Sequence, residues 1–363
     1  MFIDFYFNKY WHLYEKVYWV YYFSQGDFSQ RQEEVLQEVV AKTGFELKEK
    51  IFVGTIYDKN KIGSIIFSGV YKNKSAVLKL QGLKPDLDEP LVIEKFYAQN
   101  KSNSIRLPEI YFFEPWQEDK GYGFFIAEQI ETSRIFEMPF ANQEQMHTYI
   151  TFYQDYRTKA ITQPWSKNEI PDPLRFTFER IDNWRKISES KKRLKTEDYV
   201  PYLLNYYPLV SPHLSKFNMV FSHGHLTAND IYKDPKNPNG FILFSNLWWS
   251  YRLEWYELAF NLWACVNNIK DTSKTFEQIR DYLEDWIKIY KTIPVVQTDS
   301  DFDEKISVLL LERFLGAILV DIGVHDQFED PKNKELFEYL LDLNQKLFEY
   351  FAGKLGVSIS SID

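Results

Sequence analysis

The chain has 363 residues, of which 45% are hydrophobic, and carries a net charge of −9 at neutral pH. This length and composition can bury a core large enough for one large domain, or for two lobes that share a cleft. A general nucleic-acid binder needs clustered basic residues to neutralise phosphates, and because the chain has no lysine- or arginine-rich run, we expect no nucleic-acid partner.

The chain begins with an aromatic-rich segment, MFIDFYFNKYWHLYEKVYWVYYF. This segment lacks the basic start, the clean apolar run and the small-residue cleavage site of a signal peptide, and polar residues interrupt it too often for a membrane span. Spaced aromatic residues can form an amphipathic helix that packs on the protein's own body, on a partner or at a membrane surface. The segment is alternatively upstream sequence translated from an early start site. We favour packing on the body, and predict a helical extension over residues 1–44 without a transmembrane segment.

The end of this extension, DFSQRQEEVLQEVVAKTG, is typical of a helix that Ser29 caps and Gly44 ends. Residues 45–135 change to short β-branched or aromatic runs separated by turn residues, which predicts a small sheet-rich lobe. Residues 72–74 indicate a hairpin turn, and EPLVIEKFYAQN indicates a helix with Pro90 in its first turn. The predicted strands are KIFVGTIYD, GSIIFSGVY, SAVLKLQ, RLPEIYFFEPW and GYGFFIAEQIE.

Residues 136–363 have a mostly helical pattern, in which apolar residues recur on one face most clearly from Phe302 to Val324. A small sheet-rich part followed by a larger helical part predicts an α+β fold with two lobes, and places the boundary between Glu131 and Met138. The single cysteine, Cys265, excludes a disulfide framework and indicates a reducing, cytoplasmic setting. We interpret it as a buried small hydrophobic residue.

The stretch MVFSHGHLTANDIYKD, residues 219–234, has the outline of a kinase catalytic loop. In such a loop an apolar run enters His-Arg-Asp or His-Gly-Asp, and Asn follows after four further residues. Here His223 and Gly224 match the pattern, whereas His225 stands at the Asp position and Asp230 at the Asn position. The frame of the loop is retained, and two residues that carry its chemistry are changed.

Other parts needed for phosphoryl transfer occur upstream in the expected chain order. Lys79, in AVLKL, lies on a predicted strand between apolar neighbours, as does the kinase lysine that reaches the phosphates. Glu94, in the helix that follows, is the expected carboxylate partner of Lys79, and Glu89 is the alternative. The residues whose backbone groups could bind adenine at an interlobe hinge are Glu128, Gln129 and Ile130.

From about residue 50 to residue 262 the chain resembles the aminoglycoside phosphotransferase and choline kinase-like family, within the protein kinase-like fold. The typical family loop His-Gly-Asp-Leu-His-Pro-Gly-Asn-Ile corresponds to HGHLTANDI in this chain. The family motif Ile-Asp-Trp, followed about a dozen residues later by Asp-Leu-Ala, corresponds to ILFSNLWWSYRLEWYELAF. Ser245 then stands at the magnesium-binding Asp and Glu257 at the later motif. The resemblance implies ATP and Mg²⁺ as cofactors and a small hydroxyl-bearing acceptor.

The departures from the family motif bear most on activity. His225 can accept a proton but cannot supply the fixed negative charge that orients an alcohol, and Ser245 is neutral and a poor ligand for a hard cation. General-base help is worth about a hundred- to ten-thousandfold, so losing it together with metal polarisation predicts little ordinary kinase activity. Asp230 is the carboxylate that could retain one Mg²⁺. Only Gly54 and Gly63 lie near the first turn, where a glycine-rich loop is expected.

Two functions remain open on these residues. The first is a catalytically impaired member of the family, a pseudokinase, which binds a nucleotide or a small ligand and acts through conformation or through contact with a protein partner. The second is an active ATP-dependent phosphotransferase of aminoglycosides, choline or sugars that uses altered residues. In the second, Lys79 and Glu94 serve the phosphates, Asp230 serves magnesium and His225 lies near the acceptor. We favour the first.

Two rival interpretations concern the same region. His223, His225 and Asp230 are ligand types of a catalytic zinc site, but the family motif already assigns His223 a structural role and no spacing such as His-Glu-x-x-His occurs. The aromatic residues of LWWSYRLEWY could form a box for a quaternary ammonium ion, or a core beneath the loop, and we favour the core. These residues are Trp248, Trp249, Tyr251, Trp255 and Tyr256.

Overall fold

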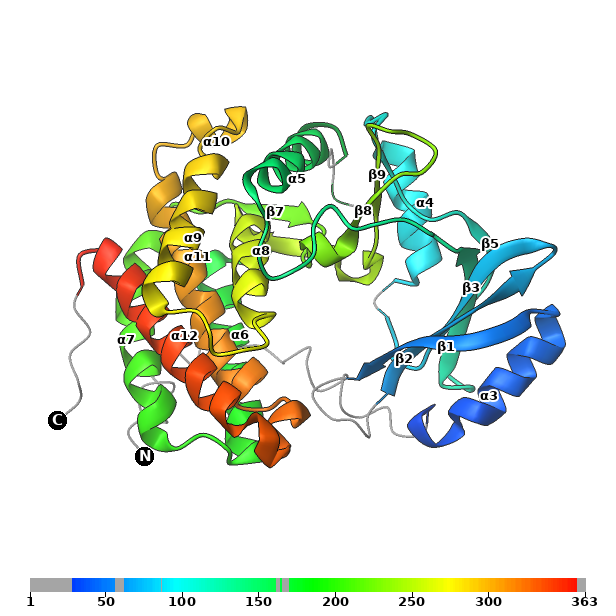
Figure 1. Ribbon diagram of the computed structural model, residues 1–363, viewed down its shortest axis with the longest axis horizontal. Helices are drawn as coiled ribbons and strands as arrows, with labels where there is room; N and C mark the ends of the chain where they lie inside the picture. The colour runs from blue at the N-terminus through cyan, green and yellow to red at the C-terminus, as the bar shows by residue number, and fades with distance from the viewer. Residues whose placement is uncertain (1–27, 56–61, 86, 161–163, 165–169, 358–363) are drawn as a thin grey trace. The chain divides into compact units, whose positions relative to one another are not determined.

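The computed structural model of the protein describes residues 28–55, 62–85, 87–160, 164 and 170–357 (Figure 1). Most of the extension predicted over residues 1–44 therefore lies outside the described residues. Contacts between residues divide the described chain into two compact units. The sheet unit contains residues 28–133 and 232–247, and the helical unit contains residues 134–231 and 248–357.

The sheet unit is built on a five-stranded antiparallel sheet in the order β1-β2-β3-β6-β5. The predicted runs form these strands because β-branched and aromatic side chains pack well on a pleated surface. The predicted hairpin is confirmed: Lys72 and Asn73 form a two-residue turn, and both have positive φ, which matches the strand twist. The strands are β1 (Glu46–Thr55), β2 (Ile62–Tyr71), β3 (Lys74–Gln81), β5 (Ile110–Gln117) and β6 (Tyr122–Glu128).

Helix α3 (Phe28–Thr43) packs against this sheet, as Figure 1 shows. Its buried apolar residues share one core with side chains of β2, β3 and β6. Gly44 follows the helix with a φ of 68°, as a glycine that ends a helix does. The prediction that Ser29 caps the helix is wrong, because the helix already includes Phe28 and the Ser29 hydroxyl instead accepts a hydrogen bond from the Ile62 N–H at 2.8 Å.

Helix α4 (Glu89–Gln99) follows β3, and Pro90 lies in its first turn, where a missing N–H has no helical partner to lose. A second, three-stranded sheet has the order β4-β9-β8 and pairs β4 in parallel with β9. Through this pairing a segment from late in the chain becomes part of the sheet unit. These strands are β4 (Ile105–Arg106), β8 (Ile231–Lys233) and β9 (Phe241–Leu243).

The helical unit packs around α11 (Phe302–Gly316), in which every residue except Asp303 and Glu304 is buried. The apolar face predicted for this helix is present, and its other faces are buried as well because neighbouring helices contact it on several sides. A π-helical turn, η5 (Ala317–Ile322), continues from its end. The helices that contact α11 include α6 (Pro173–Lys191), α7 (Thr196–Leu214), α8 (Tyr256–Asn267) and α12 (Lys334–Lys354).

Two short strands pair antiparallel with each other: β7 (Met219–Ser222) begins the catalytic-loop stretch, and β10 (Ser250–Leu253) follows that stretch in the sequence. A mixed α+β fold with a sheet-rich first part and a mostly helical remainder is thereby confirmed. No helix among the described residues is long and apolar enough to cross a membrane. The remaining elements are α5 (Gln143–Asp155), α9 (Phe276–Tyr290), α10 (Pro294–Gln297), the π turn η2 (Tyr156–Ala160) and the 3-10 turns η3 (Ala228–Asp230), η4 (Asn246–Trp248), η6 (Asp326–Glu329) and η7 (Pro331–Asn333).

Candidate functional site

Lys79 lies on β3 between two fully buried leucines, Leu78 and Leu80. These leucines point into the core shared with α3, so the alternation of the strand directs Lys79 to the opposite face. There its Nζ atom lies 2.6 Å from Oε2 of Glu89 and 5.6 Å from the ring centre of Phe125. The side chains of the ion pair are only 14% and 10% exposed, so Glu89 holds the ammonium group in one place.

The carboxylate partner of Lys79 is thus Glu89, and the prediction of Glu94 is wrong. Both residues belong to α4, but a separation of five residues turns Glu94 by about 140° around the helix axis. Glu94 is exposed, whereas Glu89 in the first turn is buried and faces Lys79. The packing of α4 decides between the two carboxylates.

The same carboxylate holds the segment that contains Ser245. Oε1 of Glu89 accepts a hydrogen bond from the backbone N–H of Asn246 at 3.2 Å, and the buried Asn246 amide donates to the Leu243 carbonyl at 3.1 Å. Ser245 is half-buried and has a φ of 60°, which is uncommon for a residue other than glycine. Glu89 therefore joins Lys79 to the segment in which the family has its magnesium-binding Asp.

The hinge prediction concerns the end of β6. The N–H of Glu128 donates to the Glu109 carbonyl at 2.8 Å, and the N–H of Gln129 donates to the Ser75 carbonyl at 3.4 Å. The N–H groups of two of the three residues whose backbone groups were predicted to bind adenine are therefore already used by the protein. The remaining residue of the predicted hinge is Ile130, whose N–H could still bind an adenine base.

A charged network not predicted from the sequence holds this end of β6. Arg106 Nη1 lies 2.6 Å from Oε2 of Glu128, and Arg106 Nε lies 2.9 Å from Oδ2 of Asp234. Lys236 Nζ lies 2.6 Å from the other oxygen of Glu128. Burial would raise the pKa of Glu128, but Arg106 and Lys236 outweigh it and lower the pKa below its usual value. The network ties the predicted hinge to the segment after β8.

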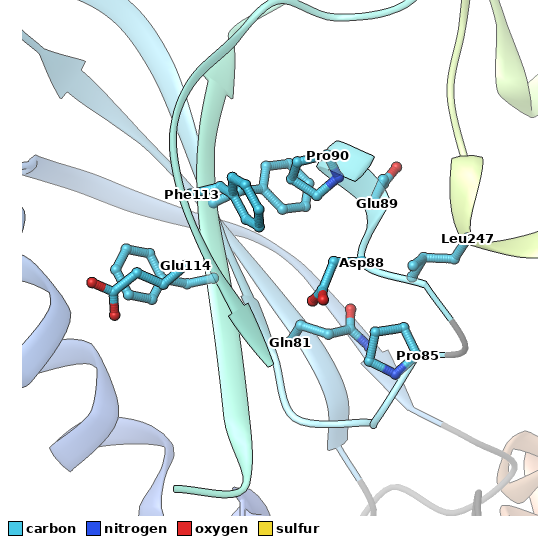
Figure 2. Close-up of a pocket in the computed structure, with 10 residues that line it drawn as sticks. Gln81, Pro85, Asp88, Glu89, Pro90, Phe113, Glu114 and Leu247 are labelled. Atoms are coloured by element: carbon cyan, nitrogen blue, oxygen red, sulfur yellow. The ribbon is translucent and has the colours of Figure 1, made fainter. Parts of the chain in front are cut away.

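A small cavity of the sheet unit lies beside the start of α4 (Figure 2). The residues around it include Gln81 and Asp88, whose side chains point toward one another in Figure 2. Asp88 also accepts a hydrogen bond from the Trp116 N–H at 2.9 Å. The cavity measures about 10 Å³, whereas pockets that hold small molecules measure roughly 300–1,000 Å³, so it is too small for a nucleotide.

In the helical unit, buried groups hold the backbone of the catalytic-loop stretch. Gly224 has a φ of 71°, and a methyl group on it would lie 2.5 Å from the Trp248 carbonyl oxygen. The N–H of His223 donates to the Tyr156 hydroxyl at 2.8 Å, which itself donates to Oε1 of Glu257 at 2.6 Å. Burial raises the pKa of Glu257 to about 6, although backbone groups of His223 and Gly224 favour its charged form. Glu257 thus clamps the loop.

The buried side chain of Asp230 links other residues of the same loop. Its Oδ2 atom accepts hydrogen bonds from the N–H and the hydroxyl of Thr227 at 2.9 and 2.8 Å, and lies 3.3 Å from Nδ1 of His225. The Asp230 side chain is 4% exposed and the His225 side chain 41% exposed. The His225 ring also stacks on Trp248 and contacts Phe260. A Mg²⁺ ion at this oxygen would compete with the Thr227 and His225 contacts.

The two rival interpretations receive no support from the geometry. Among the described residues, no group of three or more His, Cys, Asp or Glu side chains is placed to hold a metal ion. His223 is fully buried and contacts Trp249, while His225 is partly exposed. Trp249, Trp255 and Tyr256 are buried in the core and do not line an open box.

No family model and no curated protein sequence matches the chain. A microcompartment-associated aminopropanol kinase structure matches with a TM-score of 0.60 and 9% identity, over 90% of this chain and 100% of that chain. Aminoglycoside phosphotransferase APH(4)-Ia matches with a TM-score of 0.57 and 9% identity, over the same shares of the two chains. An amicoumacin kinase in complex with AMP-PNP and Ca²⁺ matches with a TM-score of 0.51 and 11% identity, over 92% and 96%.

The chain has the aminoglycoside phosphotransferase fold. The resemblance noted in the sequence is confirmed at the level of the fold, and it extends over most of the chain. Within this aminoglycoside phosphotransferase-fold protein, the site residues are divided between the two units: Lys79 and Ser245 belong to the sheet unit, and His225 and Asp230 to the helical unit.

Two residues with clear structural roles were missed by the sequence reasoning. Asn246 directly follows Ser245, and its buried side chain could have been suspected because a polar residue interrupts an apolar run there. Tyr156 gives no signal in the sequence, since one tyrosine among 25 is not distinctive and the π turn that aims it leaves no simple pattern. Glu257 was placed at its motif, but its contact with the loop backbone was not foreseen.

Proposed function

We propose that this aminoglycoside phosphotransferase-fold protein binds a nucleotide through Lys79 and is impaired in phosphoryl transfer. The Lys79–Glu89 pair is the observation that carries the proposal, because it is short, largely buried and tied to Asn246. A lysine on an open sheet surface is solvated and mobile, whereas this one is held on one face of β3. Its ammonium group supplies the point charge that binds phosphate oxygens.

The impairment follows from two residues, Ser245 and Asp230. Ser245 offers no negative charge to a magnesium ion, and the Oδ2 atom of Asp230 is engaged by Thr227 and His225. These residues do not suit a resident magnesium ion, so we assign no step to one. A nucleotide bound without efficient transfer would act by changing conformation or by contact with a protein partner. We place this activity in the reducing environment of the cytoplasm, which Cys265 favours.

Thermal unfolding with ATP, ADP or GTP tests nucleotide binding. A ligand at a hundred times its dissociation constant stabilises the fold by about 2.7 kcal/mol, so millimolar ATP should raise the melting temperature of the unmodified chain. Lys79→Met should lose this rise. Lys84→Met should keep it, because Lys84 is exposed, forms an ion pair with Glu118 at the surface and lies over the Trp116 ring. No rise with any of the three nucleotides would favour a scaffold that binds none.

Lys79→Met leaves the buried carboxylate of Glu89 without its cation, which can destabilise the fold by itself. The double change Lys79→Met with Glu89→Gln removes both charges and controls for this effect. A folded double variant that still responds to ATP would contradict the role of Lys79.

One contact favours a second function, an active phosphotransferase that acts on a small hydroxyl-bearing acceptor. Nδ1 of His225 lies 3.3 Å from the Asp230 carboxylate, so the carboxylate orients the ring. A base held by a third group is the arrangement that activates a hydroxyl in many enzymes, and the other ring nitrogen, Nε2, would accept the proton. In this case His225 replaces the family Asp as the base, with ATP as the donor.

A further inference from the structure

Three arginines of the helical unit converge on one buried tyrosine. The Tyr256 hydroxyl accepts hydrogen bonds from Nη2 of Arg180 at 3.0 Å and from Nη1 of Arg313 at 2.9 Å. The guanidinium carbon of Arg252 lies 5.5 Å from the centre of the Tyr256 ring. Burial alone would raise the pKa of Tyr256, but the guanidinium groups outweigh it and lower the pKa below its usual value. We call Arg180, Arg252 and Arg313 the arginine cluster.

The arginine cluster carries more positive than negative charge. Glu312 pairs with Arg180, with Oε1 lying 3.0 Å from Nη1. A second carboxyl close to Arg313 is that of Asp321, and burial raises its pKa to about 7 although Arg313 favours its charged form. Among the described residues, Nε of Arg313 has no hydrogen-bond acceptor, although this residue is only 6% exposed. Buried donors are almost always paired in folded proteins, so this one is open to an acceptor from outside the chain, either water or a ligand.

The arginine cluster borders the catalytic-loop stretch from two sides. A methyl group on Gly224 would lie 3.2 Å from both Nε and Nη2 of Arg252. The Phe260 ring lies 4.9 Å from the His225 ring and 5.4 Å from the guanidinium carbon of Arg313. The Phe260 ring therefore lies between the arginine cluster and His225.

The cluster also reaches the surface. Arg252 and Phe176 are half-buried, and the Phe176 ring contacts the guanidinium groups of both Arg180 and Arg252, at 5.1 and 5.8 Å. Aromatic faces restrict guanidinium groups to a few orientations and leave their N–H edges directed away from the ring. A ligand that approaches past Phe176 would meet these edges first.

We propose that the arginine cluster binds the oxyanion of a small hydroxylated acceptor, whose hydroxyl is directed to His225. Guanidinium groups bind both carboxylate and phosphate with paired N–H donors, because each anion presents two oxygens to the pair. Polycationic acceptors such as aminoglycosides are disfavoured, because they would meet the surplus positive charge. The delivery of the hydroxyl to His225 rests on the proposed function, whereas the binding of the anion does not.

Calorimetry on the full chain without nucleotide tests the binding of the anion. The ligands are matched pairs at constant ionic strength: gluconate against glucose, and glucose 6-phosphate against glucose, with kanamycin as the polycation. We expect the anionic member of at least one pair to bind at least tenfold more tightly than glucose, and kanamycin not to bind. The pair that shows the difference identifies the oxyanion as carboxylate or phosphate. Equal binding within both pairs, or binding of kanamycin alone, overturns the proposal.

Variants locate the site. Arg252→Gln should weaken binding of the anion at least tenfold, and Arg252→Lys should restore part of the loss. Arg180→Met combined with Glu312→Met removes the buried ion pair as a unit, so the fold should persist while binding falls. Arg175→Gln is the matched control on α6, because Arg175 pairs with Glu179 at 2.9 Å at the surface and should not affect binding. Unchanged binding in folded Arg252→Gln overturns the proposal.

The two proposals fail separately. Lys79 belongs to the sheet unit and the arginine cluster to the helical unit. A chain that binds gluconate or glucose 6-phosphate but gives no thermal response to ATP refutes the nucleotide proposal and supports the anion site. A chain that responds to ATP but binds neither anion refutes the anion site and supports the nucleotide proposal.

Discussion

Asp321 shows what burial does to a single ionisable residue. The carboxyl group lies in the π turn that follows α11, and burial raises its pKa to about 7 from an ordinary value of 3.8, despite the nearby Arg313 and Trp263. Between these two pH values the folded chain keeps a proton that the unfolded chain releases. The free energy of unfolding contributed by Asp321 therefore falls as the pH rises from about 4 to about 7, and changes little above pH 7.

Asp321→Asn removes this titration and should change the pH dependence of stability. Each pH unit corresponds to about 1.4 kcal/mol, so the unfolding free energy of the variant relative to the unmodified chain should rise by about 2–3 kcal/mol between pH 5 and pH 8. Urea denaturation at both pH values measures it. Glu257, whose pKa is raised to about 6, titrates equally in both proteins and cancels. Asp285→Asn, on the exposed side of α9, is the control, and a constant difference for Asp321→Asn contradicts the prediction.

At the scale of single residues, the sequence could suggest the chemistry but not the pairing. Lys79, His225 and Asp230 were each proposed as site residues from motif and position. The choice between Glu89 and Glu94 depends on which side of α4 faces the sheet, and both carboxylates fit the spacing. The arginine cluster is invisible in the sequence because its members come from three elements far apart in the chain, and nothing in their local pattern marks them.

At the scale of elements, the catalytic-loop stretch is held by its backbone more than by its side chains. The backbone of the loop is most constrained at Gly224, where φ is 71° and a methyl group would lie 2.5 Å from the Trp248 carbonyl oxygen. Strands and the long helix α11 were predictable because their periodic patterns are set by which faces are buried. The π turns after α5 and α11 were not, because they depend on the packing of their surroundings.

Gly224→Ala should destabilise the fold by about 1–3 kcal/mol, because both the positive φ and the close carbonyl oppose a methyl group. Gly353→Ala is the matched comparison. Gly353 lies within α12, a methyl group on it meets no atom within 4 Å, and alanine should stabilise a helix position by about 0.5–1 kcal/mol. Urea denaturation of both variants should therefore give effects of opposite sign. A neutral Gly224→Ala would show that the loop tolerates rearrangement.

At the scale of the whole molecule, the sequence predicted the α+β fold correctly, because the change from period-two to helical patterning is visible along the chain. Activity was less predictable, since the candidate site residues are divided between the two units and the sequence does not show their contacts. The clamp formed by Tyr156 and Glu257, and the pair formed by Lys79 and Glu89, indicate that the supporting contacts are intact in each unit.

His225→Asp combined with Ser245→Asp should therefore give a measurable gain in ATP hydrolysis. Each single change should do much less than the pair, because a base and a metal ligand act as a unit. Turnover is measured for the unmodified chain, both single variants and the double variant, and we expect none in the unmodified chain. A double variant that binds ATP but stays inert would show that more than these two positions has diverged.

The same measurement decides between the two functions. Turnover by the unmodified chain as fast as that of the double variant, lost in His225→Ala, would establish His225 as the working base and refute the impaired enzyme.

The clamp on the loop backbone has a consequence for how this chain can evolve. Tyr156 and Glu257 bind the main chain at His223 and Gly224, so these contacts do not depend on which side chain follows. The codons for aspartate and histidine differ by a single base. A lineage carrying this loop can therefore exchange one for the other at residue 225 in one mutational step, in either direction, while the clamp on the main chain stays in place.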